Sequence, residues 1–414
     1  MLAKIIFGNL RHKPLHTALS VALLALSTGI IALLLSMQTQ IEQKMERDLQ
    51  EIDLVLGAKG SPLQLVLSAV YHLDAPTGNI SMEDVQKIKR HPLVKQTIPL
   101  AYGDSYASFR IVGTDSNYVK KYDARLQYGR LFATDLEVVV GASVAQKTGL
   151  QLGQTFHSTH GEAAQGDVHE EHDYVVVGIL EPNNTVLDQL ILCTVGSVWA
   201  IHQPSEAESN HEGHDHEGHD HEGHDHEEHD HEAAEQELTA LLVKFRSPMG
   251  IMTLPRMVNE TTQMQAAVPA LEINRLLGLM GIGTAALQAL ALAILVISGF
   301  SVFITLYNRL QERRYELALL RSLGCRKGQL FFLMIAEGFL LAILGFAGGH
   351  LLSRLGLAYV NQSSQAFHFA FQYDWVPTEA WLLLGSLLVG ILAALIPAWK
   401  AYRMDVSAAL ADPS

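Results

Sequence analysis

Four stretches of the sequence are long and apolar enough to cross a lipid bilayer. They cover residues 17–37, 279–307, 330–357 and 381–399. A helix needs roughly 20 residues to cross the hydrocarbon core of a membrane. The sequence therefore predicts an α-helical membrane protein with four transmembrane helices, one near the N-terminus and three in the C-terminal part.

The long segment between the first two spans, residues 38–278, is of globular-domain size. β-Branched residues alternate along it, with Gly and Asp at the gaps, which is typical of strands. A helix start capped by Ser81 and a short helix closed by Gly149 interrupt this pattern. We therefore expect a mixed α+β domain between helices 1 and 2. Its strands are expected at residues 95–101, 105–112, 137–141, 174–180, 190–195 and 238–245.

Both ends of this domain are predicted to join the membrane through helical stalks. After the first span, apolar residues from Ile41 to Leu56 recur every three or four positions. Before the second span, the same spacing runs from Met264 to Leu271. The first stalk is expected to break at residues 57–62, where two Gly and a Pro occur.

The distribution of Lys and Arg predicts the orientation of the chain. Basic residues occupy residues 1–16, 308–329 and 400–414, which flank the spans, and such segments stay in the cytoplasm. Both termini are then cytoplasmic, while the 38–278 domain and the short 358–380 segment lie outside. The first span is longer than the apolar core of a signal peptide and no cleavage site follows it, so we interpret it as a retained anchor.

Residues 205–237 form an acidic tract that is rich in His. It contains fourteen Asp and Glu and no Lys or Arg, so it alone accounts for the formal net charge of −14. A repeat of this composition cannot bury a core, and we expect a disordered insertion between strands. The tract would repel phosphate and no basic face offsets it, which excludes nucleic-acid binding.

The same tract predicts weak binding of a divalent metal. Neutral imidazole suits Zn, Cu and Ni, and zinc is the metal we expect. The alternative is a repeat expansion that binds metal only incidentally. A sparser group favours a functional role; its members are His157, His160, His169, Glu170, Glu171 and His172. The candidate metal ligands are His211, His214, His216, His219, His221, His224, His226, His229 and His231.

Glu337 and His350 are ionisable residues within the predicted third span. Such residues are costly in lipid and indicate a function by default. Glu337 is about two turns from the cytoplasmic end, where Arg314 and Arg321 are candidate partners. A role in helix packing or coupling is therefore favoured over a proton relay. His350 is expected near the outer leaflet.

Two further features are interpreted as structural. Cys193 and Cys325 are predicted on opposite sides of the membrane, and neither has the spacing of a metal site. The Gly-rich run around Lys59 lacks the GxxxxGK[ST] spacing of a phosphate loop and is predicted outside the cytoplasm. No Walker motif occurs, so we expect this chain to have no catalytic residues and not to hydrolyse ATP itself.

The segment 313–324 is the most informative part of the sequence. Its charged residues Arg313, Glu316 and Arg321 stand among Leu residues, and Gly324 follows the last of them. This pattern predicts an amphipathic helix ended by glycine. A helix of this kind in the cytoplasm docks on a membrane surface or on a partner protein.

This segment resembles the E-x-[GA]-x-x-[RK]-[AS]-[LI]-G coupling motif of ABC transporter permeases of the MacB/FtsX/LolC type. Residues 109–115, 129–132 and 138–145 resemble the periplasmic core domain of that family, and residues 397–401 and 408–410 resemble its C-terminus. The resemblance covers nearly the whole chain and includes the arrangement of one helix followed by three. The His tract is an insertion relative to the family.

The resemblance implies that the segment fits into a groove of a cytoplasmic ABC ATPase. It implies a dimer, homomeric or built with a related permease, in the bacterial inner membrane among its lipids. ATP and Mg would bind to the ATPase, and ATP-driven closure would move the external domains against something outside. The coupling residues would be Arg313, Glu316, Ala318, Arg321, Ser322 and Gly324.

Several functions fit this family. The first is a permease subunit of a metal-linked system, with zinc as the metal, in which the His tract senses, buffers or hands over metal. The second is lipoprotein release or the efflux of peptides or macrolides. The third is a mechanotransmitter that transports nothing and activates a periplasmic protein partner. A metalloenzyme is poorly supported, because no HExxH motif or fixed three-ligand site stands outside the repeat.

Overall fold

A computed structural model describes residues 14–159, 173–202, 236–363, 371–372 and 377–406. The chain divides into two compact units. We call residues 1–43 and 277–414 the helical unit and residues 44–276 the globular unit. Among the described residues, four helices are long and apolar enough to span a membrane.

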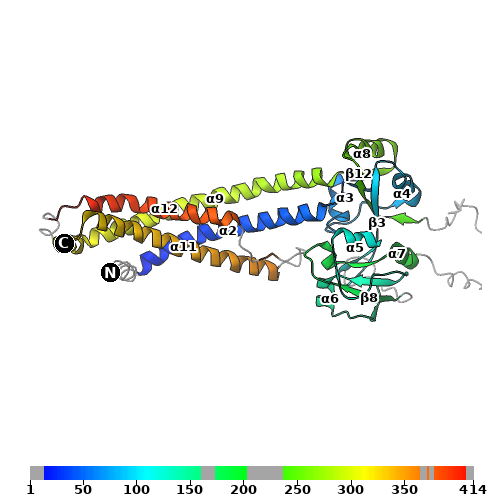
Figure 1. The fold of residues 1–414 in the computed structure, drawn as a ribbon, viewed down its shortest axis with the longest axis horizontal. Coiled ribbons are helices and arrows are strands. Elements are labelled where there is room, and N and C mark those ends of the chain that lie inside the picture. The colour runs from blue at the N-terminus through cyan, green and yellow to red at the C-terminus, as the bar shows by residue number, and fades with distance from the viewer. Residues whose placement is uncertain (1–13, 160–172, 203–235, 364–370, 373–376, 407–414) are drawn as a thin grey trace, which may run out of the picture. The chain divides into compact units, whose positions relative to one another are not determined.

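The four long helices contain the four predicted spans. They are α2 (Pro14–Leu49), α9 (Pro269–Glu312), α11 (Lys327–Ser363) and α12 (Pro377–Tyr402). In the helical unit these helices run alongside one another (Figure 1). A short helix, α10 (Arg314–Ser322), connects α9 to α11. The one-plus-three arrangement expected from the hydropathy is therefore confirmed.

Small residues set the closest approaches within the helical unit. A Cβ added at Gly349 of α11 would lie 2.0 Å from the Thr28 hydroxyl of α2 and 2.8 Å from the Gly29 nitrogen. Membrane helices associate through van der Waals packing, which such positions permit. The apolar interior around them includes Leu24, Val302, Leu306, Leu341 and Ala394.

The globular unit is built on one large mixed sheet. Over the described residues this sheet has ten strands in the order β12-β1-β11-β3-β4-β9-β6-β8-β5, with β7 paired to β8. The pairs β4–β9 and β6–β8 are parallel, and the remaining pairs are antiparallel. The strands are β1 (Leu54–Ala58), β3 (Val94–Tyr106), β4 (Phe109–Thr114), β5 (Leu126–Gly129), β6 (Glu137–Val140), β7 (Thr155–Phe156), β8 (Tyr174–Leu180), β9 (Ile191–Thr194), β11 (Ala240–Phe245) and β12 (Met264–Ala267).

Six α-helices and one short helix surround this sheet (Figure 1), counted over the part of the chain that the structure describes. They are α3 (Pro62–Ala69), α4 (Met82–Lys89), α5 (Ser116–Lys121), α6 (Ala142–Thr148), η1 (Val186–Gln189), α7 (Val195–His202) and α8 (Met249–Thr261). A two-stranded sheet pairs β2 (Ile80–Ser81) with β10 (Glu237–Leu238). The mixed α+β domain between helices 1 and 2 is confirmed.

Local sequence signals account for several helix ends. The Ser81 hydroxyl accepts a hydrogen bond from the Asp84 N–H at 3.3 Å, as the sequence predicts for an N-cap. Gly149 closes α6 with a φ of +75°, a left-handed conformation that glycine adopts without steric cost. The six predicted strands each overlap an observed strand.

The two predicted stalks need a correction. Leu54–Ala58 and Met264–Ala267 are the neighbouring strands β1 and β12, not helix. Leu54, Val55 and Leu56 are all fully buried, because β1 lies inside the sheet between β11 and β12. A strand buried on both faces shows a continuous apolar run instead of alternation. Its apparent helical spacing therefore came from the residues of α2 that precede it.

Candidate functional site

The short helix α10 carries the residues expected to meet an ATPase. Leu317 and Ala318 are buried at 2% and 0% exposure, and Leu317 packs with Leu310 and Leu330. The opposite side of the helix presents Tyr315 and Leu319, each 47% exposed. α10 is therefore amphipathic, as the sequence predicts, with one face buried in the helical unit and another accessible.

Polar contacts fix both ends of α10. Arg313 Nε donates to Glu316 Oε2 at 2.8 Å on the exposed side. Arg321 Nη1 donates to the carbonyl oxygen of Met404, just beyond α12, at 2.5 Å. Gly324 ends the segment with a φ of +102°, and a Cβ added there would meet no atom within 4 Å, so its role is conformational.

The predicted coupling residues thus divide into three groups. Glu316, Ser322 and Gly324 are exposed. Arg313 and Arg321 are partly buried. Arg313 pairs with Glu316 of α10 itself, and Arg321 ties α10 to the residues after α12. Ala318 has no exposed surface on this chain. Its side chain is buried inside the helical unit, and its expected contact with an ATPase stays a prediction.

Glu337 of α11 is 1% exposed, and the cation near it is Arg309 of α9. Arg309 also donates a hydrogen bond from Nη2 to the Thr17 hydroxyl of α2. The expected partners of Glu337 were Arg314 and Arg321, but Arg321 is engaged with Met404. Charges buried in a membrane helix bundle are normally paired. Arg309 thus links α9 to α2 by a hydrogen bond, and its charge interacts with that of Glu337 on α11.

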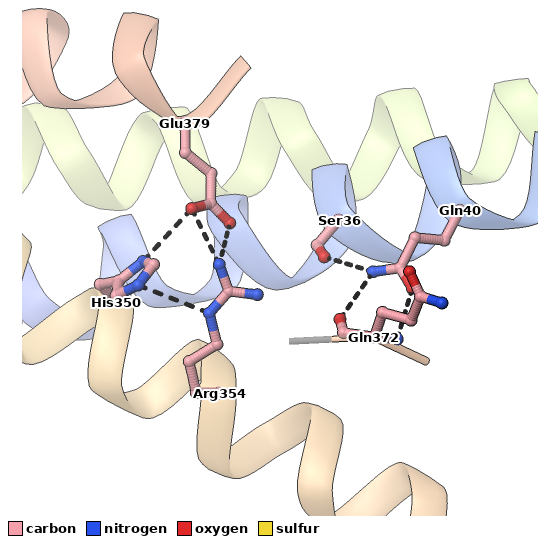
Figure 2. Close-up of polar contacts among 6 residues, drawn as sticks. All are labelled: Ser36, Gln40, His350, Arg354, Gln372 and Glu379. Carbon is pink, nitrogen blue, oxygen red and sulfur yellow. Dashed lines mark hydrogen bonds and ion pairs between the residues drawn. The ribbon is translucent and has the colours of Figure 1, made fainter. Parts of the chain in front are cut away.

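A second buried charge cluster joins α11 to the start of α12 (Figure 2). Both carboxylate oxygens of Glu379 accept from Arg354 Nη2 at 3.1 Å, and Glu379 is fully buried. His350 Nδ1 lies 3.3 Å from Glu379 Oε2, and Arg354 Nε donates to His350 Nε2 at 3.4 Å. Sequence reasoning found His350 but missed its two partners. The signal available was the spacing of four between His350 and Arg354, which places them on one helix face.

Two carboxamide side chains hold the residues that precede α12. The Gln40 amide of α2 accepts from the Gln372 N–H at 2.7 Å and donates to the Gln372 carbonyl at 3.1 Å (Figure 2). It also donates to the Ser36 hydroxyl at 2.9 Å. Asn361 binds Phe371 in the same way, at 2.8 and 2.9 Å. Each amide thus reproduces the pairing of a neighbouring strand. We call Gln40 and Asn361 the amide clamps.

The last turn of α2 is tied into the globular unit by polar contacts. The Tyr71 hydroxyl donates to the Met45 carbonyl at 3.1 Å, and Lys121 Nζ donates to the Asp48 carbonyl at 2.8 Å. The last four carbonyls of a helix have no partner within the helix, so the Lys121 ammonium satisfies that of Asp48. β1 begins at Leu54, four residues after α2 ends. We call residues 44–54 with Tyr71 and Lys121 the joint.

The predicted metal ligands His211 to His231 lie outside the described residues. Of the sparser His group only His157 is described, and its Nδ1 lies 3.2 Å from Asp173 Oδ1. Within the described ranges no group of three His, Cys, Asp or Glu is arranged to hold a metal ion. The metal hypothesis therefore rests on the sequence alone.

The structure also shows the surroundings of Lys59 and Cys193, two residues that the sequence analysis interprets as structural. Lys59 Nζ donates to the Asn259 carbonyl at 3.1 Å, which ties the end of β1 to α8. Cys193 is fully buried, and burial raises the pKa of its thiol to about 12, so the nucleophilic thiolate is absent at neutral pH. Both observations agree with the packing roles predicted.

Two known protein families match successive parts of the chain. Residues 17–211 match the family described as MacB-like periplasmic core domain. Residues 289–406 match the family described as FtsX-like permease C-terminal. Two matches in this order cover the first span, much of the globular unit, and the segment with α10, α11 and α12.

Among curated proteins, the chain is 26% identical to an uncharacterized ABC transporter permease protein of Mycobacterium tuberculosis over 64% of this chain. It is 30% identical to the macrolide export ATP-binding/permease protein MacB of Escherichia coli over 28% of this chain. The matches cover 28% and 18% of those relatives, so the chain spans about a quarter of their length or less. The periplasmic region of MacB from Actinobacillus actinomycetemcomitans aligns over 56% of this chain and 97% of its own length, at 10% identity and a TM-score of 0.34.

Proposed function

Because the chain belongs to the MacB/FtsX type of ABC transporter permeases, we propose that it transmits the work of a partner ABC ATPase to its globular unit. In this proposal the ATPase is a separate subunit that binds ATP and Mg. The permease lies in the bacterial inner membrane with both termini in the cytoplasm, as a dimer. The globular unit then acts in the periplasm.

The single observation that carries this proposal is the exposed face of α10. Tyr315 and Leu319 are 47% exposed, Leu323 is 78% exposed, and Glu316 stands beside them with its carboxylate accessible. Large apolar side chains gathered with a charge on one helix face are typical of a protein-binding surface. The other face is buried in the helical unit, so a force applied to α10 is passed to α9 and α11.

The joint supports the second half of the proposal. α2 leads into β1 after four residues, and β12 leads into α9 after Val268 alone. β1 and β12 are hydrogen-bonded neighbours, and β1 also pairs with β11 inside the sheet. The two helices are therefore attached to neighbouring strands at one edge of the sheet rather than to loose linkers. In this proposal, such an attachment passes a displacement of α2 and α9 directly to β1 and β12.

The test is directed at the exposed face of α10. Leu319→Asp places a charge on the proposed docking face, while Leu271→Asp alters a similarly exposed Leu (66%) on α9 and serves as the matched control. We expect Leu319→Asp to abolish co-purification of an ABC ATPase, identified by its nucleotide-binding signature, and Leu271→Asp to retain it. Equal retention by both variants would remove α10 as the docking helix.

A second proposal is that the complex serves a metal-linked system, with zinc as the metal. It is supported by the nine His of residues 211–231, each beside Asp or Glu, since flexible imidazole pairs bind divalent zinc. Lipoprotein release, peptide or macrolide efflux, and activation of a periplasmic partner without transport are the alternatives. They predict that the tract is dispensable.

The metal proposal is tested with cell-associated zinc and growth under chelation. Intact protein is compared with a full deletion and with a deletion of residues 211–232 only. We expect both deletions to lower zinc or growth and added zinc to restore it. Unchanged zinc and growth in the full deletion would reject the metal link, whereas an effect of the full deletion alone would leave the tract without a role.

A further inference from the structure

The globular unit contains a cavity of about 230 Å³ beside the joint. α5, β3 and β11 form its walls, and Glu51, in the turn after α2, completes them. The lining residues are Glu51, Gln96, Ile98, Asn117, Lys120, Lys121, Leu242, Val243 and Lys244. A volume of this size accommodates a small organic molecule rather than a single water.

The strand register explains why one side of the cavity is apolar and its edge polar. Ile98 of β3 lies directly opposite Leu242 of β11, and Gln96 lies opposite Lys244. Residues two apart on a strand share a face of the sheet. Ile98 and Leu242 are 7% and 2% exposed and form the floor, while Gln96 and Lys244 stand at the rim.

The rim carries more positive than negative charge. Lys244 pairs with Glu51. Lys120 is exposed, and its ammonium group makes no hydrogen bond or ion pair with the described residues. Lys121 Nζ is directed to the main-chain carbonyl of Asp48 rather than to a carboxylate.

The charge of Lys121 is only partly compensated by its surroundings. Its charged neighbours are Asp48 and Glu51, and Lys44 and Lys95 in turn lie near these two carboxylates. Burial lowers the pKa of Lys121 to about 7 in spite of both acids. An anion placed in the cavity would stabilise the protonated ammonium, so its binding would take up a proton near neutral pH.

We propose that this cavity binds a small organic carboxylate. The carbon skeleton would lie on the Ile98–Leu242 floor, and the carboxylate would meet the ammonium groups of Lys120 and Lys121. Lys is a flexible point charge with three donors, which suits a carboxylate without demanding bidentate geometry. Gln96 and Asn117 supply further hydrogen-bonding groups at the rim.

Because the cavity lies beside the joint, a ligand bound there would affect the joint itself, which is distinct from the coupling of α10 to an ATPase. Lys121 holds the last turn of α2, and Glu51 lies between α2 and β1. A carboxylate bound between them would add a contact to the joint itself. The ligand would thereby change the stability of the attachment that α2 makes to the sheet. This inference holds whichever ATPase the permease uses.

The experiment measures ligand binding to the full chain in phosphatidylcholine nanodiscs by isothermal titration calorimetry. Succinate and glutamate are the probes, and chloride maintains constant ionic strength. We expect saturable binding that Lys120→Gln weakens about ten-fold, the usual effect of losing a hydrogen bond to a charged group. Lys147→Gln, an exposed Lys of α6 outside the cavity, is the matched control and should bind as the unaltered chain does.

Three results would overturn the proposal. The first is the absence of saturable binding by either probe. The second is equal weakening by Lys120→Gln and Lys147→Gln. The third is binding of inorganic phosphate as tight as that of succinate, because the apolar floor would then contribute nothing. Affinity should also fall as the pH rises from 7 to 9, and this fall should disappear in Lys121→Met.

Discussion

Gly338 of α11 and Gly390 of α12 face each other so closely that neither position has room for a side chain. A Cβ at Gly338 would lie 2.6 Å from the Gly390 carbonyl oxygen, and a Cβ at Gly390 would lie 2.7 Å from the Gly338 carbonyl oxygen. Both obstructing atoms belong to the backbone, so a side chain cannot be accommodated by a change of rotamer. The two helices must separate if either glycine is replaced.

The close contact between these two glycines predicts different outcomes for two substitutions in the membrane helices. Gly338→Ala should destabilise the helical unit by about 1–3 kcal/mol, the usual cost of forcing extra volume into a packed interior. Gly385→Ala on α12 meets no atom within 4 Å and should be neutral. Unfolding in mixed micelles measures both. Equal stability of the two variants would show that α11 and α12 separate freely.

The buried Glu379–Arg354 pair predicts non-additive mutational effects. Removing one partner leaves a buried charge without compensation, which costs about 3–5 kcal/mol. Arg354→Leu and Glu379→Leu should each be destabilising, and the double variant should be less so than the sum of the two. A double-mutant cycle on thermal unfolding measures this coupling. Strict additivity would mean that the pair does not interact in the membrane.

The amide clamps predict site-specific changes in hydrogen exchange. Gln40→Leu removes the acceptor of the Gln372 N–H, and Asn361→Leu removes that of the Phe371 N–H. Each substitution should speed exchange of its own amide about ten-fold, as expected when a bond worth about 1.4 kcal/mol is lost. Each variant is the control for the other. Acceleration of both amides in both variants would indicate one cooperative opening.

Lys121 predicts a pH dependence in the globular unit. Burial lowers its pKa from 10.5 to about 7 in the folded state, so between these values the unfolded chain binds more protons than the folded one. The stability that Lys121 contributes should therefore rise with pH from about 7 to about 10. Over this pH window, the unfolding midpoint of the unaltered chain should rise relative to that of Lys121→Met. A constant difference would contradict the lowered pKa.

The spans and the main strands were predictable because they are long, repetitive signals. A run of about 20 apolar residues has few alternative structures, and the alternation in 174–180 matches β8 to the residue. β1 was missed because both of its faces are buried, which removes the alternation. A sequence motif such as that of α10 shows which residues belong to the motif but not which side of the helix is buried. The burial of Ala318 is therefore seen only in the structure.

The buried polar contacts were less predictable from sequence. Glu379 falls in the segment 358–380, which reads as an external connection, and it is 25 positions from Arg354. Gln40 and Asn361 are neutral residues whose partners are backbone atoms 332 and 10 positions away. No periodicity links such pairs, because tertiary packing alone brings them together.

The pairing of β1 with β12 restricts which movements reach the sheet. These strands are joined by four registered pairs, from Val55 opposite Ala267 to Ala58 opposite Met264. If α2 were drawn along its axis while α9 stayed still, that ladder would shear and its hydrogen bonds would break. If both helices advance together, the ladder is undisturbed. In the proposed function, in-phase strokes of the two helices would therefore reach the globular unit with this ladder intact, whereas out-of-phase strokes would break it.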